Sequence, residues 1–133
     1  MRYRGRPYML ATPAPHDRYT AGQALAAKER RSMAPSVTLA QVYARIRQRL
    51  SADASESYVA RLAAQGQDAV LKKIGEECCE VLLAAKNGER APAVHELADL
   101  WFHLLVWMAQ AGIAPEDVEA ELGRRYHQGQ TPG

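Results

Sequence analysis

Residues 94–111 read VHELADLWFHLLVWMAQA, and this stretch decides the fold. On a helical wheel at about 100° per residue, its large apolar side chains cover almost the whole circumference. One narrow polar stripe remains, formed by Glu96, Asp99 and His103. A helix that is apolar nearly all round is a buried helix. The sequence therefore predicts a buried helix over residues 92–111, with Pro92 in its first turn and Gly112 at its end.

A second long helix is predicted over residues 68–86, with Asp68 as its N-cap and Asn87-Gly88 at its end. Its apolar face carries Val70, Leu71, Ile74, Cys78, Val81 and Ala85. Glu77 and Glu80 project together from a stripe at the edge of this face. Glu76 falls nearly opposite the apolar face, so we do not expect it to join them.

The other periodic segments are also helical. Thr38 or Ser36 caps a segment in which apolar residues recur at three- and four-residue spacing up to Leu50. A short helix follows over residues 57–64, with Gly66 as its C-cap, and a last helix covers residues 115–126. No stretch alternates with period two. We therefore predict an all-α bundle of about four to five helices over residues 37–127, with a frayed tail over residues 128–133.

Residues 1–36 differ in composition from the rest of the chain. They hold four of the seven prolines, many arginines and few large aliphatic residues, so they cannot bury enough surface to offset their ordering entropy. We expect a disordered basic extension in which residues 21–31 form a transient helix. Alternatives are an organellar transit peptide, a basic arm, or a chain that starts at Met33 and lacks the preceding residues.

The charge distribution and composition exclude several classes of protein. Residues 1–50 carry ten basic and two acidic residues, whereas residues 51–133 carry seven basic and thirteen acidic residues. The hydrophobic half is thus the acidic half, which argues against a nucleic-acid-binding surface. No apolar run approaches the ~18–20 residues of a membrane span, and no secretory signal opens the chain. The neighbouring Cys78 and Cys79 indicate reduced thiols and a cytoplasmic location.

The two long helices carry two pairs of carboxylates, Glu77 with Glu80 and Glu96 with Asp99. About eight residues connect the helices, so we expect antiparallel neighbours that bring the pairs face to face. Carboxylates beside a buried helix are costly unless they are paired or bind a metal. Oxygen ligands favour Mg²⁺ or Mn²⁺, and Mg²⁺ usually also binds substrate phosphates. The implied chemistry is metal-assisted attack of water on a phosphoanhydride.

Structural interpretations of the same residues stay open. The carboxylates can instead form ordinary ion pairs with Lys73, Arg61, Arg124 or Arg125. His103, one turn from Asp99, either orients that carboxylate or is a satisfied, half-buried histidine. We expect the two cysteines to pack in or near the core, and Trp101 and Trp107 to pack in the core or in a subunit interface.

The segment Glu77-x-x-Glu80, fifteen intervening residues and Glu96-x-x-Asp99 resembles the signature of the MazG-like all-α nucleotide pyrophosphohydrolases. Three further blocks narrow the resemblance to the phosphoribosyl-ATP pyrophosphohydrolase family. They are Ser57-Tyr58, the run KKIGEE over residues 72–77 and the run AAKNG over residues 84–88. The resemblance covers about residues 37–127.

The resemblance implies hydrolysis of the α–β phosphoanhydride of phosphoribosyl-ATP to phosphoribosyl-AMP and pyrophosphate, in histidine biosynthesis. It also implies a homodimer that requires Mg²⁺ and acts on a small nucleotide, with no nucleic-acid or membrane partner. By motif, the residues that hold Mg²⁺ and activate the attacking water are Glu77, Glu80, Glu96 and Asp99. The candidates for substrate binding are Lys73, Lys86 and Asn87. With no second domain in front of it, the chain is expected to be the stand-alone form of the enzyme.

Two other functions remain possible for the same sequence. A nucleoside triphosphate pyrophosphohydrolase with a house-cleaning role would share the metal site and differ in its base and ribose contacts. A non-catalytic helical dimerisation module would use the acidic stripe for ion pairs alone. These functions differ in the substrate from which the protein releases pyrophosphate, so an assay on each substrate distinguishes them.

Overall fold

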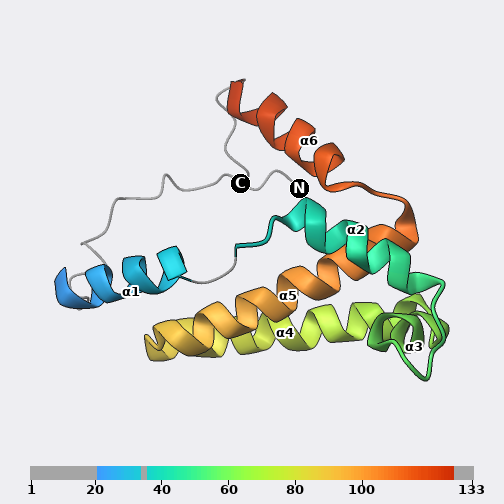
Figure 1. Ribbon diagram of the computed structural model, residues 1–133, viewed down its shortest axis with the longest axis horizontal. Coiled ribbons are helices and arrows are strands. Elements are labelled where there is room, and N and C mark those ends of the chain that lie inside the picture. The colour runs from blue at the N-terminus through green and yellow to red at the C-terminus, as the bar shows by residue number, and fades with distance from the viewer. Residues whose placement is uncertain (1–20, 34–35, 128–133) are drawn as a thin grey trace, which may run out of the picture. The chain divides into compact units, whose positions relative to one another are not determined.

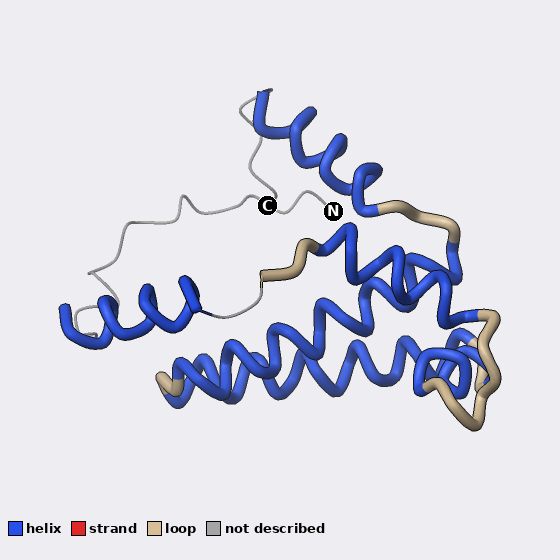
Figure 2. The backbone as a smooth tube through the Cα atoms, in the orientation of Figure 1, coloured by secondary structure: helices blue, strands red, loops and turns tan. Residues whose placement is uncertain are grey.

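The structure is a computed structural model that describes residues 21–33 and 36–127 of the chain. These residues form α-helices and contain no strand, so the predicted all-α class is confirmed for them (Figures 1 and 2). The helices are α1 (Ala21–Met33), α2 (Leu39–Leu50), α3 (Tyr58–Ala64), α4 (Gln67–Asn87), α5 (Arg90–Ala111) and α6 (Pro115–His127).

The chain divides into two compact units, Met1–Ser36 and Val37–Gly133, and each is described by itself. The described part of the first unit is α1, which has Arg30 and Arg31 in its last turn. Residues 1–20 and 34–35 lie outside the described residues, as does the tail over 128–133. The expected disordered extension and frayed tail therefore stay predictions.

Helices α4 and α5 form an antiparallel hairpin, the largest helix–helix contact of the Val37–Gly133 unit (Figure 1). Only Gly88 and Glu89 connect them, fewer than the eight residues expected, because α5 already begins at Arg90 (Figure 2). Gly88 adopts a left-handed conformation with φ of 71°, which favours glycine, and its N–H donates to the carbonyls of Ala84 and Ala85. This tight turn puts the two carboxylate-bearing helices side by side.

The hydrophobic core lies where α2 and α3 pack against the hairpin. Val70 of α4 and Val106 of α5 are fully buried there. The other buried members of this cluster are Tyr43, Ile46, Val59, Leu62 and Leu105. The core is thus concentrated around the first turns of α4 and the second half of α5.

The prediction that the 92–111 helix is buried nearly all round is wrong for the single chain. Within α5 only His103, Leu105 and Val106 are buried, whereas Val94 is 51% exposed and Trp101 is also 51% exposed. The reason is that, in the described part of the chain, the main partners of α5 are α4 and α2, and they leave a stripe with Val94, Leu97 and Trp101 40–51% exposed. That apolar side faces outward.

Cys78 and Cys79 are not bonded to each other, as predicted, but the expectation that they pack in or near the core is wrong for the single chain, because both are exposed. They lie on the part of α4 that is not covered by α2 or α3, and Leu71 and Leu82 on the same helix are exposed as well. Trp107 does pack against the core, as one of the two interpretations expected.

Helix ends agree with the sequence at most positions. Thr38 caps α2 through a capping box with Gln41, Ser57 caps α3, and Gly112 ends α5 in a left-handed conformation. Two assignments were wrong. The C-cap of α3 is Gln65, so Gly66, with φ of 91°, is the N-cap of α4 instead. Asp68 therefore lies in the first turn of α4 and does not cap it.

Among the described helices, none taken singly has the length and apolar composition needed to cross a membrane. Only the pair Arg90–Ala111 and Pro115–Tyr126, which is bent by 105°, meets both criteria together.

Candidate functional site

Three carboxylates from the two long helices converge in one place. Glu77 projects from α4, and Glu96 and Asp99 project from consecutive turns of α5. Each offers one oxygen, and these oxygens all lie within 4.8 Å of one another. All three residues are partly buried. We call Glu77, Glu96 and Asp99 the acidic cluster, and its existence shows that the hairpin does bring carboxylates of the two motifs together.

The fourth predicted carboxylate, Glu80, lies one turn after Glu77 on α4 and is exposed. The structure does not include it among the residues whose oxygens converge within 4.8 Å. Its role as a ligand therefore stays a prediction.

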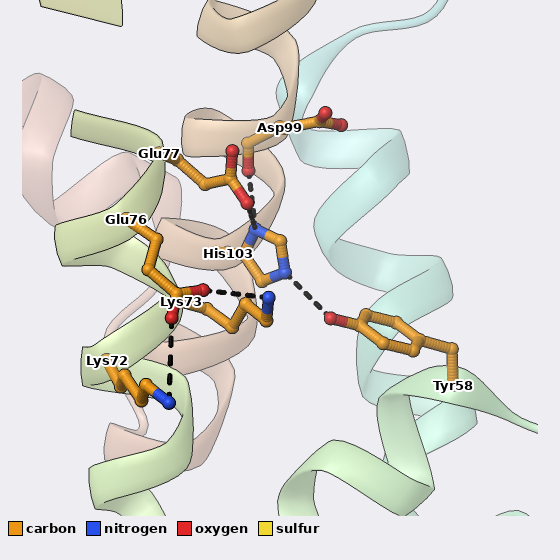
Figure 3. Close-up of polar contacts among 7 residues, drawn as sticks. All are labelled: Tyr58, Lys72, Lys73, Glu76, Glu77, Asp99 and His103. Atoms are coloured by element: carbon orange, nitrogen blue, oxygen red, sulfur yellow. Dashed lines mark hydrogen bonds and ion pairs between the residues drawn. The ribbon is translucent and has the colours of Figure 1, made fainter. Parts of the chain in front are cut away.

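The contacts of the nearby cations bear on the ion-pair alternative. Lys73 donates a 2.8 Å hydrogen bond from Nζ to Glu76, as shown in Figure 3. Arg125 and Arg124 both bind Glu121 on α6. The Arg61 guanidinium lies over the Tyr58 ring, 5.8 Å from its centroid. The hydrogen bond of Lys73 and the ion pairs of Arg124 and Arg125 described above thus go to Glu76 and Glu121, which lie outside the acidic cluster.

Histidines are the recorded ion-pair partners of the acidic cluster. Nε2 of His95 lies 3.4 Å from Asp99 Oδ2, and Nδ1 of His103 lies 3.9 Å from Glu77 Oε1. Besides these histidines, Lys73 interacts with the acidic cluster, because its pKa is raised mainly by Glu76 and to a smaller extent by Glu77. The acidic cluster thus brings three carboxylates together while Lys73 is hydrogen-bonded to a fourth, Glu76.

Lys73, a candidate for substrate binding, is held by a local pair on α4. Its hydrogen bond to Glu76 raises the pKa of Lys73 and lowers the pKa of Glu76. Glu76 thus lies outside the acidic cluster, as the helical wheel predicted, and both members of the pair stay charged at neutral pH.

The other two candidates for substrate binding, Lys86 and Asn87, are exposed residues at the end of α4. Lys86 lies nine positions after Glu77, which is about 14 Å along the axis at 1.5 Å per residue. Their contact with substrate stays a prediction that requires an extended ligand.

One polar contact was missed from the sequence. The Tyr58 hydroxyl lies 2.9 Å from Nε2 of His103, across 45 residues of chain (Figure 3). His103 is buried, and its Nδ1 lies 2.8 Å from the backbone carbonyl oxygen of Asp99. The expected contact with the Asp99 carboxylate is thus made with the Asp99 backbone instead, and the carboxylate that the ring approaches is that of Glu77. No local pattern pairs a residue at the start of α3 with one in the middle of α5.

Fold and site together define a class: an all-α protein with an acidic cluster between two long antiparallel helices. Comparison with known families gives the particular family. The model of the PRA-PH family, described as phosphoribosyl-ATP pyrophosphohydrolase, matches residues 39–126. The chain belongs to the phosphoribosyl-ATP pyrophosphohydrolase family, and the resemblance seen in the sequence is confirmed.

Individual relatives agree with this assignment. The phosphoribosyl-ATP pyrophosphatase of Methylococcus capsulatus is 52% identical over 81 residues, which is 61% of this chain and 77% of the relative. That of Pelotomaculum thermopropionicum is 62% identical over 69 residues, 52% of this chain and 70% of the relative. The histidine biosynthesis bifunctional protein HisIE of Deinococcus radiodurans is 56% identical over 88 residues, which is 66% of this chain and 40% of that longer protein.

Proposed function

We propose that this chain hydrolyses phosphoribosyl-ATP with release of pyrophosphate. It is a phosphoribosyl-ATP pyrophosphatase, a hydrolase of histidine biosynthesis. Family membership over residues 39–126 supports the activity. The observation that carries the proposal in the structure itself is the convergence of three carboxylate oxygens within 4.8 Å.

The cofactor that fits this donor set is Mg²⁺. Glu77, Glu96 and Asp99 offer only oxygen atoms, which are the ligands of hard divalent cations. We further assign Glu80 to the same site as a fourth carboxylate. When bound, the ion supplies charge neutralisation for the polyphosphate and lowers the pKa of an attacking water.

The reaction is the hydrolysis of the α–β phosphoanhydride. The oxygen of water forms a new bond to phosphorus, the bridging P–O bond breaks, and phosphoribosyl-AMP and pyrophosphate separate. The carboxylates of the site orient the attacking water and accept its proton.

Lys73 is the residue that we assign to a phosphate oxygen. Its ammonium group lies one turn from Glu77 on α4 and stays charged because Glu76 raises its pKa. The pair is exposed, with side-chain exposures of 43% and 42%, so solvent screens it and Lys73 can exchange Glu76 for a phosphate at low cost.

We also assign a homodimer to the enzyme. Large apolar side chains of the hairpin are exposed in the single chain: Leu71, Leu82, Leu83, Val94, Leu97 and Trp101. Apolar side chains gathered on one helix pair are typical of a protein–protein interface. A second copy would cover the side of α5 that the sequence predicted to be buried. The cytoplasmic location stays a prediction that rests on the two unpaired cysteines.

The direct test measures pyrophosphate release by purified protein with Mg²⁺, in parallel on phosphoribosyl-ATP and on ordinary nucleoside triphosphates. The account predicts rapid release from phosphoribosyl-ATP and at most slow release from the triphosphates, with both abolished by a chelator. Release mainly from triphosphates would instead support the house-cleaning enzyme. Absence of release from every substrate would support the dimerisation module.

A further inference from the structure

The Tyr58–His103 hydrogen bond joins α3 to α5 directly beside the acidic cluster (Figure 3). We propose that Tyr58 and His103 are positioning residues that hold the Glu77 carboxylate in the orientation the cation site requires. This inference rests on the proposed function, since it concerns the same site. Neither residue belongs to the acidic cluster, and neither is assigned a contact with substrate.

The hydrogen bonds of His103 select one tautomer of its ring. Nδ1 faces the backbone carbonyl of Asp99 at 2.8 Å, and a carbonyl only accepts, so Nδ1 carries the proton. In the neutral ring Nε2 is then an acceptor, and the Tyr58 hydroxyl donates to it at 2.9 Å. The Tyr58 hydroxyl therefore stabilises the tautomer whose N–H points toward α4 and α5 and away from α3.

That N–H also faces Glu77. Nδ1 lies 3.9 Å from Glu77 Oε1, and the side chains of His103 and Glu77 are only 8% and 15% exposed. At this distance the contact is electrostatic and does not qualify as a hydrogen bond. In a partly dehydrated environment, an N–H dipole fixed beside a carboxylate still favours one orientation of that carboxylate. Because Glu77 is the member of the acidic cluster that comes from α4, its orientation determines whether the cluster closes around a cation.

The Tyr58 ring is held by its neighbours independently of its hydroxyl. It stacks on Phe102 with ring centroids 6.2 Å apart, and it meets the His103 ring edge-on at 6.1 Å. Replacing Tyr58 by phenylalanine therefore preserves the packing and removes the hydrogen bond to His103, together with a weak electrostatic interaction with Lys73. Mn²⁺ affinity without substrate reports on the first of these, because Lys73 is assigned to substrate. Tyr58→Phe therefore distinguishes a positioning role of the hydroxyl from a packing role of the ring.

The experiment compares the intact protein with Tyr58→Phe, and uses Tyr43→Phe in α2 as the matched control for loss of a tyrosine hydroxyl from the core. Electron paramagnetic resonance measures the affinity for Mn²⁺ in the absence of substrate. Nitrogen-15 NMR of the histidine rings reports the tautomer of His103. Loss of an outer hydrogen bond to a metal ligand typically costs 10–100-fold in metal affinity or activity.

We expect Tyr58→Phe to weaken Mn²⁺ binding and to lower kcat by about tenfold, the lower end of that range. We also expect the Nε2 signal of His103 to shift, because the hydroxyl that donates to it is gone, while Nδ1 keeps its proton through Asp99. Tyr43→Phe should match the unmodified protein in all three readouts. A merely structural role of the hydroxyl would leave the affinity for Mn²⁺ unchanged.

A second pair of variants tests the direction of the N–H. His103→Asn places an amide donor near the position of Nδ1, whereas His103→Gln places its amide near the position of Nε2. We expect the asparagine variant to keep severalfold tighter Mn²⁺ binding than the glutamine variant. Equal affinities would contradict an orienting N–H, and circular dichroism checks that both variants fold.

The outcomes distinguish this inference from the proposed function. If the unmodified protein binds no Mn²⁺ and releases no pyrophosphate, both fail. If the unmodified protein does both and Tyr58→Phe matches it in Mn²⁺ affinity and kcat, the positioning role alone is overturned.

Discussion

Two parts of the α4–α5 hairpin are built on opposite principles. At the core end, around Val70, Leu105 and Val106, α2 and α3 cover the hairpin and the two valines are fully buried. In the part from the middle of the hairpin toward the Gly88 turn, which we call the acidic end, Glu77, Glu96 and Asp99 converge and the apolar residue Val94 is 51% exposed. The core end is buried by helices of the same chain, whereas the acidic end has clustered negative charge and exposed apolar side chains. We interpret the acidic end as the part that a cation and a second subunit complete.

The largest expected effect tests whether the acidic end includes Glu80. Glu80→Gln keeps the size of an exposed side chain, so we expect the fold to be unaffected. If Glu80 is the fourth carboxylate of the site, kcat/KM for phosphoribosyl-ATP should fall about a hundredfold or more, as for other groups that stabilise a transition state electrostatically. Activity close to that of the unmodified protein would restrict the site to the three residues of the acidic cluster.

A second effect concerns the uncovered apolar surface. Trp101 is half exposed in the single chain, and tryptophans at interfaces commonly contribute 2 kcal/mol or more. We therefore expect Trp101→Ala to weaken dimerisation by about 2 kcal/mol, or roughly thirtyfold, in sedimentation-equilibrium experiments. If the unmodified protein stays monomeric at high concentration, there is no such interface. If Trp101→Ala dimerises as tightly as the unmodified protein, the interface is not on this side of α5.

The core end should respond in stability alone. Val106→Ala removes two methyl groups from a fully buried position, so we expect the free energy of unfolding to fall by about 2 kcal/mol. For a domain of this size the melting temperature should drop by roughly 10 °C. Below that temperature the affinity for Mn²⁺ should be unchanged. A large loss of Mn²⁺ affinity would show that the two ends are not independent.

The smallest expected effect is on stability and concerns Glu121, which is paired with Arg124 and Arg125. Hydrogen bonds from Arg124 and Arg125 lower the pKa of Glu121 to about 2. A lowered pKa stabilises the fold above the usual pKa of 4.5, and this contribution disappears as the pH falls toward 2. We expect Glu121→Gln to be slightly less stable than the unmodified protein at pH 7 and equal to it near pH 2, as measured by denaturant titration. Its Mn²⁺ affinity should not change, which makes it a control for the acidic cluster.

The sequence predicted the local features of the fold well, because helix periodicity, caps and turns depend on neighbouring residues. Thr38, Gly88 and Gly112 end or begin helices where expected. The short connection at Gly88 also allowed the meeting of Glu77 with Glu96 and Asp99 to be predicted.

The failures of prediction all concern surroundings that the local sequence does not encode. The apolar circumference of α5 predicted burial, but a single chain covers only part of it, so Trp101 is exposed. On α4, Cys78 is exposed as well. The Tyr58–His103 hydrogen bond depends on how α3 packs against α5, which no pattern within either helix specifies. Sequence periodicity predicts which face is apolar, and the structure shows which part of that face this chain covers itself.

The central claim is that the acidic end is a cation site, and one pair of melting curves tests it most directly. Asp99→Asn removes one charge from the acidic cluster, so without metal we expect it to melt at or above the temperature of the unmodified protein. Mg²⁺ at about a hundred times its dissociation constant should stabilise the unmodified protein by about 2.7 kcal/mol, and should leave the variant almost unchanged. If Mg²⁺ shifted both proteins equally, or neither, the acidic cluster would not be the cation site.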